Sequence, residues 1–598
     1  MSGTTGVAAR PRRVERGLAS PISSSGNPRK GEEGIALIVV LLLGLVALAL
    51  ATALVSYGGS SIPVSRASQD WNASLSAAEG GLDDYIHRLS IDGNYWTYTT
   101  PPDGNQALSQ PVPLPGPTNE AKFEYKVDEA PTPAKPTVRV TVTGTYRNSQ
   151  RSIQATLRRT SFLDFLYATD FETKDPLAYD PSIDGNAQPG NVPKTIAWAQ
   201  ANCQAYRFPK TGLAARHASC TRIVFISADT LNGPVHSNDS LLIEGNPTFK
   251  DKVGTNWTAA PAGHEWVDNR TSSPFSVPKF EKGIFVKNYL PLPKANSALR
   301  ELANGTVAGS GTGCLYTGPT RITLRNDGKY DVVSPRTVST LPGCGPGTAI
   351  ALPPNGVIYV QNVFPYGSGD PNANQLASNP CSYKNTGSGA AWLACGTPNS
   401  AGVTYPPGLP VPLKDDLTNT SAVEKYIHTN GDLFISGTLK GRLTVGAQND
   451  IVVVEDLKYS DTSSASTDIL GLIPQNSVKV FHPVNKNTGA NIGTTWSDGN
   501  ATIYAAMLAI ARSISVQNYN KGAPRGLLSI RGVMAQKYRG IVGTSSGGTP
   551  VSGFAKDYLY DGRLQVQSPP HFLDPVRTPW EVKTWAEVDT PPEHKTGI

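Results

Sequence analysis

The sequence predicts a mainly β protein with an N-terminal transmembrane and stalk α-helix, a small antiparallel sheet and a large β-rich domain. We expect the large domain to be a right-handed parallel β-solenoid, with β-sandwiches as the alternative. Three observations lead to this prediction. One long apolar run lies near the N-terminus, segments of alternating apolar and polar residues follow it, and short β-branched runs then recur between Gly and Asn residues.

The composition is typical of a folded chain with many turns. Charged residues make up 17% of the 598 residues, well below the roughly 25% of average soluble domains. The 58 Gly and 49 Pro residues enrich the chain in turn formers without reaching the roughly 25 to 30% that is typical of low-complexity disorder. A net charge of +6 over this length gives no polybasic patch, so we expect no nucleic-acid partner.

An uncharged apolar run of 24 residues, 34–57, is the strongest single signal. As a helix it would be about 36 Å long, enough to cross a hydrocarbon core of about 30 Å. The basic segment 1–33 precedes it with a net charge of +3. The positive-inside rule therefore predicts a cytoplasmic leader, a single-pass helix in the cell membrane and an extracytoplasmic body at the cell surface.

Three interpretations of this apolar run stay open, and the third rests on the residues around it, which are described below. It could be a permanent signal anchor, or a cleaved secretory signal with a small-residue site at Ala51–Ala53, although ordinary secretory signals have only about 7 to 15 apolar residues. After a break at 58–63 that contains Gly and Pro, residues 58–92 are predicted to continue as an amphipathic stalk helix. Its apolar residues recur mostly at steps of three, four and seven: Val64, Trp71, Leu75, Ala78, Leu82, Tyr85, Ile86 and Leu89.

A basic leader, the segment Lys30–Gly34 and the apolar start of the following helix resemble the N-terminus of the type IV pilin superfamily, in particular the PilX-type minor pilins. Segment Ser76–Leu82 also resembles the Ala, Glu and Gly segment of PilX-like helices. The resemblance covers about residues 28–90. It implies cleavage between Gly34 and Ile35 by a prepilin peptidase, and other pilin-like subunits as partners.

One position departs from the pattern of the major pilins. Those proteins carry Glu at the fifth mature position, which is thought to help a subunit enter the filament, and here that position is Val39. The resemblance therefore implies a minor or accessory subunit rather than a core subunit. A bitopic membrane protein with an ordinary stalk helix is the alternative.

Residues 93–161 are predicted to form the small antiparallel sheet. Segments 137–143 and 152–158 alternate apolar and polar residues, as a sheet with one buried face requires, and the turn 146–151 would join them as a hairpin. Segment 121–127 supplies a further strand. Since a long N-terminal helix on such a sheet is the pilin head arrangement, the resemblance implies a small pilin-like domain here.

Residues 222–556 are predicted to form the solenoid-like body with long Cys-containing loops. Short β-branched runs recur there between Gly and Asn corners, most clearly in Asn430–Val454, and strands that stack in parallel need such corners. Segments Leu231–Gly245 and Tyr426–Gly437 echo each other in sequence. Residues 162–221 are expected to be a linker region with a disulfide loop.

The six cysteines lie outside the membrane in this topology, where an even number favours disulfides. Six cysteines allow fifteen connectivities, and their spacing suggests local pairs: Cys203 with Cys220, Cys314 with Cys344, and Cys381 with Cys395. Metal ligation is the alternative, but zinc sites usually bring Cys pairs two to four residues apart. The Pro-rich tail 557–598 is expected to cap the last coil.

The sequence contains no recognisable catalytic, nucleotide-binding or metal-binding motif. We therefore predict no enzyme activity, no cofactor, and no catalytic, cofactor-binding or metal site. Gly543–Gly547 matches G-x-S-x-G, but a Gly-Thr-Pro segment follows where the motif requires a helix. His236 and His428 occupy matching places in the echo segments and are interpreted as residues of a shared corner or stacking position rather than as a ligand pair. Several carboxylates fall in the predicted coils: Asp229, Asp239, Asp432, Asp450, Glu455 and Asp456.

Together these observations predict a membrane-anchored, pilin-like surface protein with a structural or adhesive role, a minor or accessory component of a type IV pilus-like apparatus. Its expected partners are the membrane, other pilin-like subunits, a prepilin peptidase and a surface or polysaccharide ligand. Two alternatives stay open. One is a surface-anchored β-helix polysaccharide hydrolase or lyase, which would need a group of neighbouring carboxylates in a groove. The other is a plain envelope scaffold protein.

Overall fold

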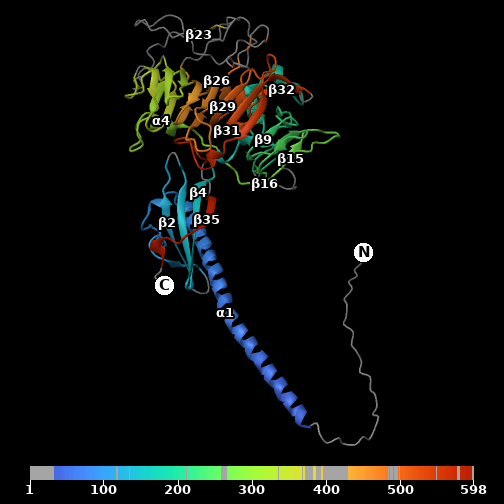
Figure 1. Ribbon diagram of the computed structural model, residues 1–598. Coiled ribbons are helices and arrows are strands. Elements are labelled where there is room, and N and C mark those ends of the chain that lie inside the picture. Colours follow the sequence, from blue (N-terminus) through green and yellow to red (C-terminus); the bar gives the residue numbers. More distant parts are fainter. Residues whose placement is uncertain are drawn as a thin grey trace.

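The computed structural model is mainly β and has the predicted small antiparallel sheet, preceded by one long helix. Figure 1 shows helix α1 leading into the small sheet, with the large β body at the far end. The structure describes residues 33–598 except 116–118, 133–134, 211, 258–264, 335, 338, 366–367, 369, 371–381, 385–391, 395–428, 483, 485–488, 490–495, 497–498, 547–548, 576–579 and 596–598, and the side chains of 33–36, 54–62, 382–384, 392–394 and 549 are also outside the description.

Helix α1, Glu33–Ile91, is one continuous element of 59 residues. The break predicted at 58–63 does not occur, because the single Pro63 removes only one backbone hydrogen bond and helical periodicity continues on both sides. The predicted membrane span 34–57 extends at both ends into side chains outside the description. Among the described residues, no helix offers an apolar stretch of sufficient length to cross a membrane.

The C-terminal half of α1 packs against a five-stranded antiparallel sheet. Its buried face includes Ala78, Leu82, Tyr85 and Leu89, which belong to the predicted apolar stripe. The strands lie in the order β1 (Val112–Pro113), β2 (Ala121–Glu129), β3 (Val138–Tyr146), β4 (Ser149–Arg159) and β35 (Trp580–Val588).

Helix and sheet approach very closely at Gly144 of β3. A Cβ atom at this position would lie 2.1 Å from the Ser74 carbonyl oxygen and 2.2 Å from the Ala78 nitrogen of α1. Only glycine permits this approach, because both contacts are with backbone atoms that cannot rotate away.

The last strand of the small sheet comes from the C-terminus of the chain. Strand β35 pairs antiparallel with β4, from Trp580 opposite Arg159 to Val588 opposite Ser152. The expectation that 557–598 is a tail capping the last coil is therefore wrong for this segment. The segment instead extends the small sheet as an edge strand beside β4, and its Trp580 is buried with the core of that sheet.

The large body consists mainly of short strands paired in parallel. One ladder of parallel strands runs in the order β17 (Cys314–Thr317), β21 (Val357–Gln361), β25 (Arg442–Ala447), β27 (Ile469–Pro474), β29 (Ala501–Ala509), β31 (Leu527–Tyr538), β5 (Tyr167–Phe171), β10 (Val235–Ser237), β13 (Val253–Thr255) and β16 (Ile284–Val286).

A second parallel ladder lies beside the first. Its strands follow the order β18 (Thr320–Leu324), β24 (Leu433–Leu439), β26 (Ile451–Tyr459), β29, β31, β34 (Ala555–Tyr560), β9 (Thr230–Asn232), β12 (Thr248–Phe249) and β15 (Lys279–Phe280). Smaller parallel sets are formed by β8 (Phe225–Ile226), β11 (Leu241–Glu244) and β14 (Trp266–Asp268), and by β26, β28 (Val478–Val480) and β30 (Ile514–Val516).

Glycine makes sharp corners between adjacent sets of parallel strands possible. Gly437 in β24 and Gly532 in β31 have φ values of +105° and +148°, which side chains rarely allow. A Cβ at Gly532 would also lie 2.0 Å from the Ala505 carbonyl oxygen of the neighbouring strand. The interior between the ladders is filled by aliphatic side chains such as Ile435, Val453 and Leu472, all fully buried.

The order of strands in space differs from their order in sequence. Strand β5 lies between β31 and β10, so the parallel strands of residues 166–290 stack on β31. The body therefore begins before residue 222, and the predicted linker 162–221 contributes a strand to its centre. Apolar and polar residues do not alternate along β5, and four of its five residues are buried, because the strand is covered on both faces.

The β17–β18 end of the ladders is closed by local structure. Strand β18 turns into an antiparallel meander with β19 (Lys329–Val333) and β20 (Gly347–Ala351). The disulfide Cys314–Cys344 ties this meander to β17, and helix α4 (Ser297–Ala303) packs on β21. Two hairpins, β22 (Ser382–Lys384) with β23 (Trp392–Ala394) and β32 (Gly543–Ser546) with β33 (Thr549–Gly553), complete the strands named here.

Candidate functional site

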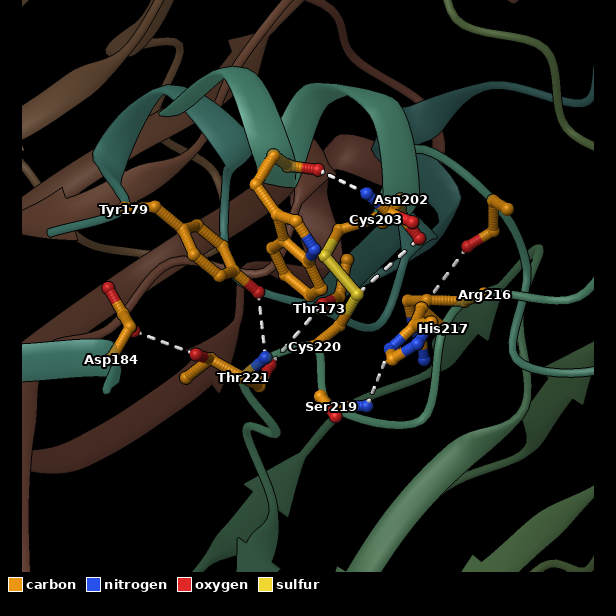
Figure 2. Close-up of a disulfide and its surroundings, with 12 residues drawn as sticks. Thr173, Tyr179, Asp184, Asn202, Cys203, Arg216, His217, Ser219, Cys220 and Thr221 are labelled. Atoms are coloured by element: carbon orange, nitrogen blue, oxygen red, sulfur yellow. Dashed lines mark hydrogen bonds between the residues drawn. A yellow bond between two sulfur atoms is a disulfide. The ribbon is translucent and has the colours of Figure 1, made fainter. Parts of the chain in front are cut away.

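A disulfide-closed loop covers the middle of the body where β5, β10 and β31 meet. Helix α3, Ile196–Asn202, ends at Cys203, which is bonded to Cys220 across 17 residues. Figure 2 shows this disulfide among polar side chains of the loop. Closing a loop of this length restricts the unfolded chain and stabilises the fold by about 3 kcal/mol in the chain-entropy model.

Hydrogen bonds fix the end of this loop at Thr221. The Thr221 backbone N–H donates to the Tyr179 hydroxyl at 2.7 Å, and the Thr221 hydroxyl donates to Asp184 at 2.7 Å (Figure 2). The ammonium of Lys174 pairs with the same Asp184 carboxylate at 2.9 Å and is 3% exposed. The carboxylate therefore links the loop to helix α2 (Pro181–Asp184) through buried polar contacts.

A second buried carboxylate, Asp239, organises the other side of the loop. It accepts hydrogen bonds from the backbone N–H groups of Glu172 at 3.1 Å and Arg207 at 2.9 Å, and it pairs with Arg216 at 2.7 Å. The side chain of Asp239 is fully buried. Because charge-assisted bonds to a desolvated carboxylate are strong and directional, the three segments are held in one arrangement.

The main cavity lies between this loop and the β32–β33 hairpin and has a volume of about 720 Å³. Four cationic residues and two carboxylates are part of its lining: Lys194, Arg222, Arg539, Lys556, Asp184 and Asp229. Two of the cations are held by buried carboxylates. Lys556 reaches both oxygens of Asp229 at 2.9 Å, and Arg539 donates to Glu172 at 3.1 Å.

Burial changes the acid–base properties of this region. It lowers the pKa of Lys556, and the neighbouring Asp229 carboxylate opposes that shift. Arg539 also lies with its guanidinium carbon 3.6 Å from the centre of the Phe225 ring, a cation–π contact in a desolvated setting. The cavity wall therefore presents cations that are fixed in place rather than mobile surface side chains.

A smaller cavity of about 140 Å³ lies on the other side of the loop segment. Its lining includes three arginines, Arg207, Arg216 and Arg222, together with Glu172 and His217. We call it the arginine cavity. It shares part of its wall with the main cavity at Ala218 and at Cys220, Thr221 and Arg222.

The predicted disulfides can be compared directly with the structure. The pairs Cys203–Cys220 and Cys314–Cys344 are both present, whereas Cys381 and Cys395 lie outside the described residues. The predicted cleavage residues Gly34 and Ile35 belong to the first turn of α1, and their side chains are also outside the description.

The two echo histidines are not brought together by any described contact. His236 is buried in β10, where its Nε2 lies 3.0 Å from the Asn238 side-chain oxygen, and burial lowers its pKa to about 4. His428 lies outside the described residues. His236 is therefore a neutral packing residue under ordinary conditions. It stacks between Ala168 and Gly254 of the neighbouring strands, so the stacking interpretation fits and the corner interpretation does not.

The carboxylates of the predicted coils bind separate partners. Their partners are the Lys556 ammonium for Asp229, Arg216 for Asp239, the Asp450 backbone N–H for Asp432, Lys479 for Asp450, Arg321 for Glu455 and Lys458 for Asp456. In the part of the chain that the structure describes, no group of three His, Cys, Asp or Glu residues is arranged to hold a metal ion. These carboxylates therefore form local ion pairs and hydrogen bonds within the body.

Ser545 of the G-x-S-x-G segment lies in the lining of the main cavity. It belongs to the hairpin strand β32, opposite Pro550 of β33, and not to a turn between a strand and a helix. The described lining of the main cavity contains no histidine. This geometry is that of a Ser- and Gly-rich hairpin.

Sequence reasoning did not find the two cavities. The arginines at 207, 216 and 222 lie on both sides of Cys220, and their concentration in a chain with few charges was an available signal. The three arginines converge because of the disulfide and because of Asp239, which lies between β10 and β11.

Comparisons with known proteins identify no family. No protein-family model matches the sequence, and no curated protein matches it at a significant level. Among solved structures, the chain shows a distant likeness to the competence-associated pilin ComZ from Thermus thermophilus, with 11% identity, coverage of 87% of this chain and 97% of that one, and a TM-score of 0.25. A likeness at this score supports no inference about function.

Proposed function

We propose that this chain is a membrane-anchored, pilin-like surface protein that serves as a minor or accessory component of a type IV pilus-like apparatus. Helix α1 is the anchoring and assembly element, the small sheet is its head domain, and the large body is displayed away from the membrane. Its role is structural or adhesive rather than enzymatic.

The exposed apolar segment Leu37–Leu50 of α1 is the observation that supports this proposal most strongly. Eleven large apolar side chains between Leu37 and Leu50 are 47 to 65% exposed, whereas in the C-terminal half of the same helix one apolar face, with Ala78, Leu82, Tyr85 and Leu89, is buried against the sheet. An apolar surface of this extent is not stable in water and requires lipid or neighbouring apolar helices around it.

The parallel ladders support a display role for the body. We interpret them as a right-handed parallel β-solenoid, because successive strands pair in parallel and glycine corners at Gly437 and Gly532 join adjacent sets of parallel strands. A β-sandwich would instead consist of antiparallel sheets. Such a stack is rigid and presents loops on its sides, as a binding or structural module requires.

The proposal is tested by following the full chain in cells that produce it. We expect the wild-type protein in the membrane fraction and, after mechanical shearing, in the filament fraction, with its body accessible to protease on intact cells. Gly34→Val, which places a branched side chain at the predicted cleavage position, should keep the protein in the membrane and remove it from the sheared fraction.

Gly44→Ala is the matched control within the same apolar helix, because no atom lies within 4 Å of a Cβ at that position. It should behave as the wild type. If wild type and Gly34→Val are both absent from sheared filaments and equally abundant in the membrane, the filament role is wrong and the chain is an anchored scaffold.

A further inference from the structure

The arginine cavity contains more positive charge than its carboxylates balance. Arg216 is paired with Asp239 at 2.7 Å, and Glu172 is paired with Arg539 at 3.1 Å. Among the described contacts, Arg222 donates only to the neutral Asn269 side chain, at 3.0 Å, and Arg207 forms no ion pair. Two guanidinium groups therefore have no ion pair of their own in the wall of a small cavity, although the Asp239 carboxylate lies close enough to raise the pKa of Arg207 in part.

Arg207 also has an unsatisfied polar atom. Its Nε is buried and has no hydrogen-bond partner among the described residues, although burying an unpaired charged donor costs free energy. Burial lowers the pKa of Arg207, and the nearby guanidinium groups of Arg222 and Arg216 lower it further. The folded chain thus holds these like charges together, and an anion between them would relieve both the repulsion and the missing hydrogen bond.

The loop is built so that this arrangement persists. Asp239 fixes the Arg207 backbone and the Arg216 side chain, and the disulfide Cys203–Cys220 fixes the loop that carries Arg216 (Figure 2). A preorganised site loses less conformational entropy on binding than mobile surface side chains would.

From these contacts we infer that the arginine cavity binds a phosphate group through Arg207, Arg216 and Arg222. Phosphate carries about −1.5 to −2 charges near pH 7, which matches the two guanidinium groups that have no ion pair of their own, and arginine forks bind its oxygens in pairs. The volume of about 140 Å³ exceeds the roughly 10 to 15 Å³ that one water requires, so the group can enter.

The neighbouring main cavity indicates what carries the phosphate. It adjoins the arginine cavity at Thr221 and Arg222, and its lining adds Ser219, Tyr519 and Asn520 to apolar residues such as Ile183. A combination of hydroxyl, amide, aromatic and apolar groups suits a sugar ring. The ligand is accordingly a saccharide phosphate. That this saccharide comes from a cell surface rests on the proposed function, whereas the binding of phosphate does not depend on it.

The test uses the purified full chain in a non-ionic maltoside detergent, which contains no phosphate, and measures binding of inorganic phosphate and of glucose 1-phosphate by isothermal titration calorimetry. We expect one saturable site for each, with glucose 1-phosphate at least about tenfold tighter. Arg207→Gln and Arg222→Gln should each weaken both affinities by about tenfold or more, the effect of losing one charged hydrogen bond.

Arg325→Gln is the control, since it removes an exposed arginine paired with Asp327 and Asp331 near the β17–β18 end, and it should bind as the wild type does. Arg222 is exposed, so Arg222→Gln should unfold at the same temperature as the wild type. This variant keeps the test valid if Arg207→Gln fails to fold. Absence of saturable phosphate binding, or equal binding by wild type and Arg222→Gln, would overturn the inference. Equal affinity for the two probes would overturn the sugar assignment alone, and none of these outcomes depends on filament assembly.

Discussion

The small sheet and the large body place their charges in opposite ways. Ion pairs of the small sheet lie at its surface, as in Lys126–Glu593, whose side chains are 45% and 48% exposed. Around β5 and β31 of the body the pairs are buried, as in Arg539–Glu172, at 4% and 0%. Surface pairs contribute little free energy, whereas buried pairs have large desolvation costs.

This difference indicates what each region is built for. The small sheet relies on apolar packing and an antiparallel ladder, which is sufficient for a unit that supports a helix. The body gains no obvious stability from its buried charges, since apolar residues of equal volume would often serve as well. We infer that these charges are there to fix the loop and to hold the arginines, and the predictions below test that contrast.

The largest expected effect concerns strand β35, which joins the small sheet from the far end of the chain. Trp580 is 8% exposed within the apolar core, so Trp580→Ala should lower the free energy of unfolding of the small sheet by about 4 kcal/mol. Hydrogen exchange measured by mass spectrometry should show faster exchange in β4, with β29 and β31 of the body unchanged.

Trp585→Ala is the matched control on the same strand. Its side chain is 46% exposed, and a surface substitution of this kind should cost less than about 1 kcal/mol. Equal effects of the two substitutions, or faster exchange throughout the body, would mean that the small sheet and the body are not separate units of stability.

The second prediction compares the two disulfides of the body. The double substitution of Cys203 and Cys220 by Ala should lower the free energy of unfolding by about 3 kcal/mol and weaken phosphate binding. Removal of Cys314–Cys344, which closes a longer loop of 30 residues, should cost a similar amount and leave phosphate binding intact. Thermal unfolding and calorimetry measure both effects, and loss of binding in the second variant would contradict the role assigned to the first loop.

The third prediction is that pH affects the two regions in opposite directions. Burial lowers the pKa of His236 in the body from 6.5 to about 4, so the unfolded chain binds a proton first as pH falls below 6.5, and stability is lost. Between pH 8 and 5 this loss should be about 2 kcal/mol. His236→Gln should remove that part of the pH dependence.

Burial raises the pKa of Glu124 in the small sheet from 4.5 to about 7. Between pH 4.5 and 7 the folded chain keeps the Glu124 proton while the unfolded chain releases it. The free energy of unfolding therefore falls as pH rises from 4.5 toward 7. Relative to Glu124→Gln, the wild-type small sheet should lose about 2 kcal/mol between pH 5 and 8. Denaturant unfolding at each pH measures the free energy of unfolding of the wild type and of each variant. The account would be contradicted if the His236 contribution and the Glu124 contribution to that free energy changed in the same direction with pH.

Local patterns in the sequence were sufficient for much of the fold. The predicted strands at 137–143 and 152–158 correspond to β3 and β4, because alternation of apolar and polar residues reports burial directly. The pairing of β35 with β4 was not predicted, although Trp580–Val588 has strand-like alternation, because nothing local specifies a partner more than 400 residues away.

The candidate site was less predictable for the same reason. The pairing of Cys203 with Cys220 followed from spacing, but the positions of β5 and Asp239 beside that loop result from stacking of coils that are distant in sequence. The contact order of such parallel stacks is high, so their sites are assembled from residues that no short motif contains.

The mature N-terminus of the membrane-extracted protein tests the central proposal most directly, and mass spectrometry of its N-terminal peptide measures it. The account predicts a chain that begins at Ile35, with the helix that displays its apolar side chains from Leu37 to Leu50 placed at the start of the mature protein. A chain that begins at Met1 or Ser2 would contradict pilin-like processing, and a chain that begins near Leu54 would contradict the anchor itself.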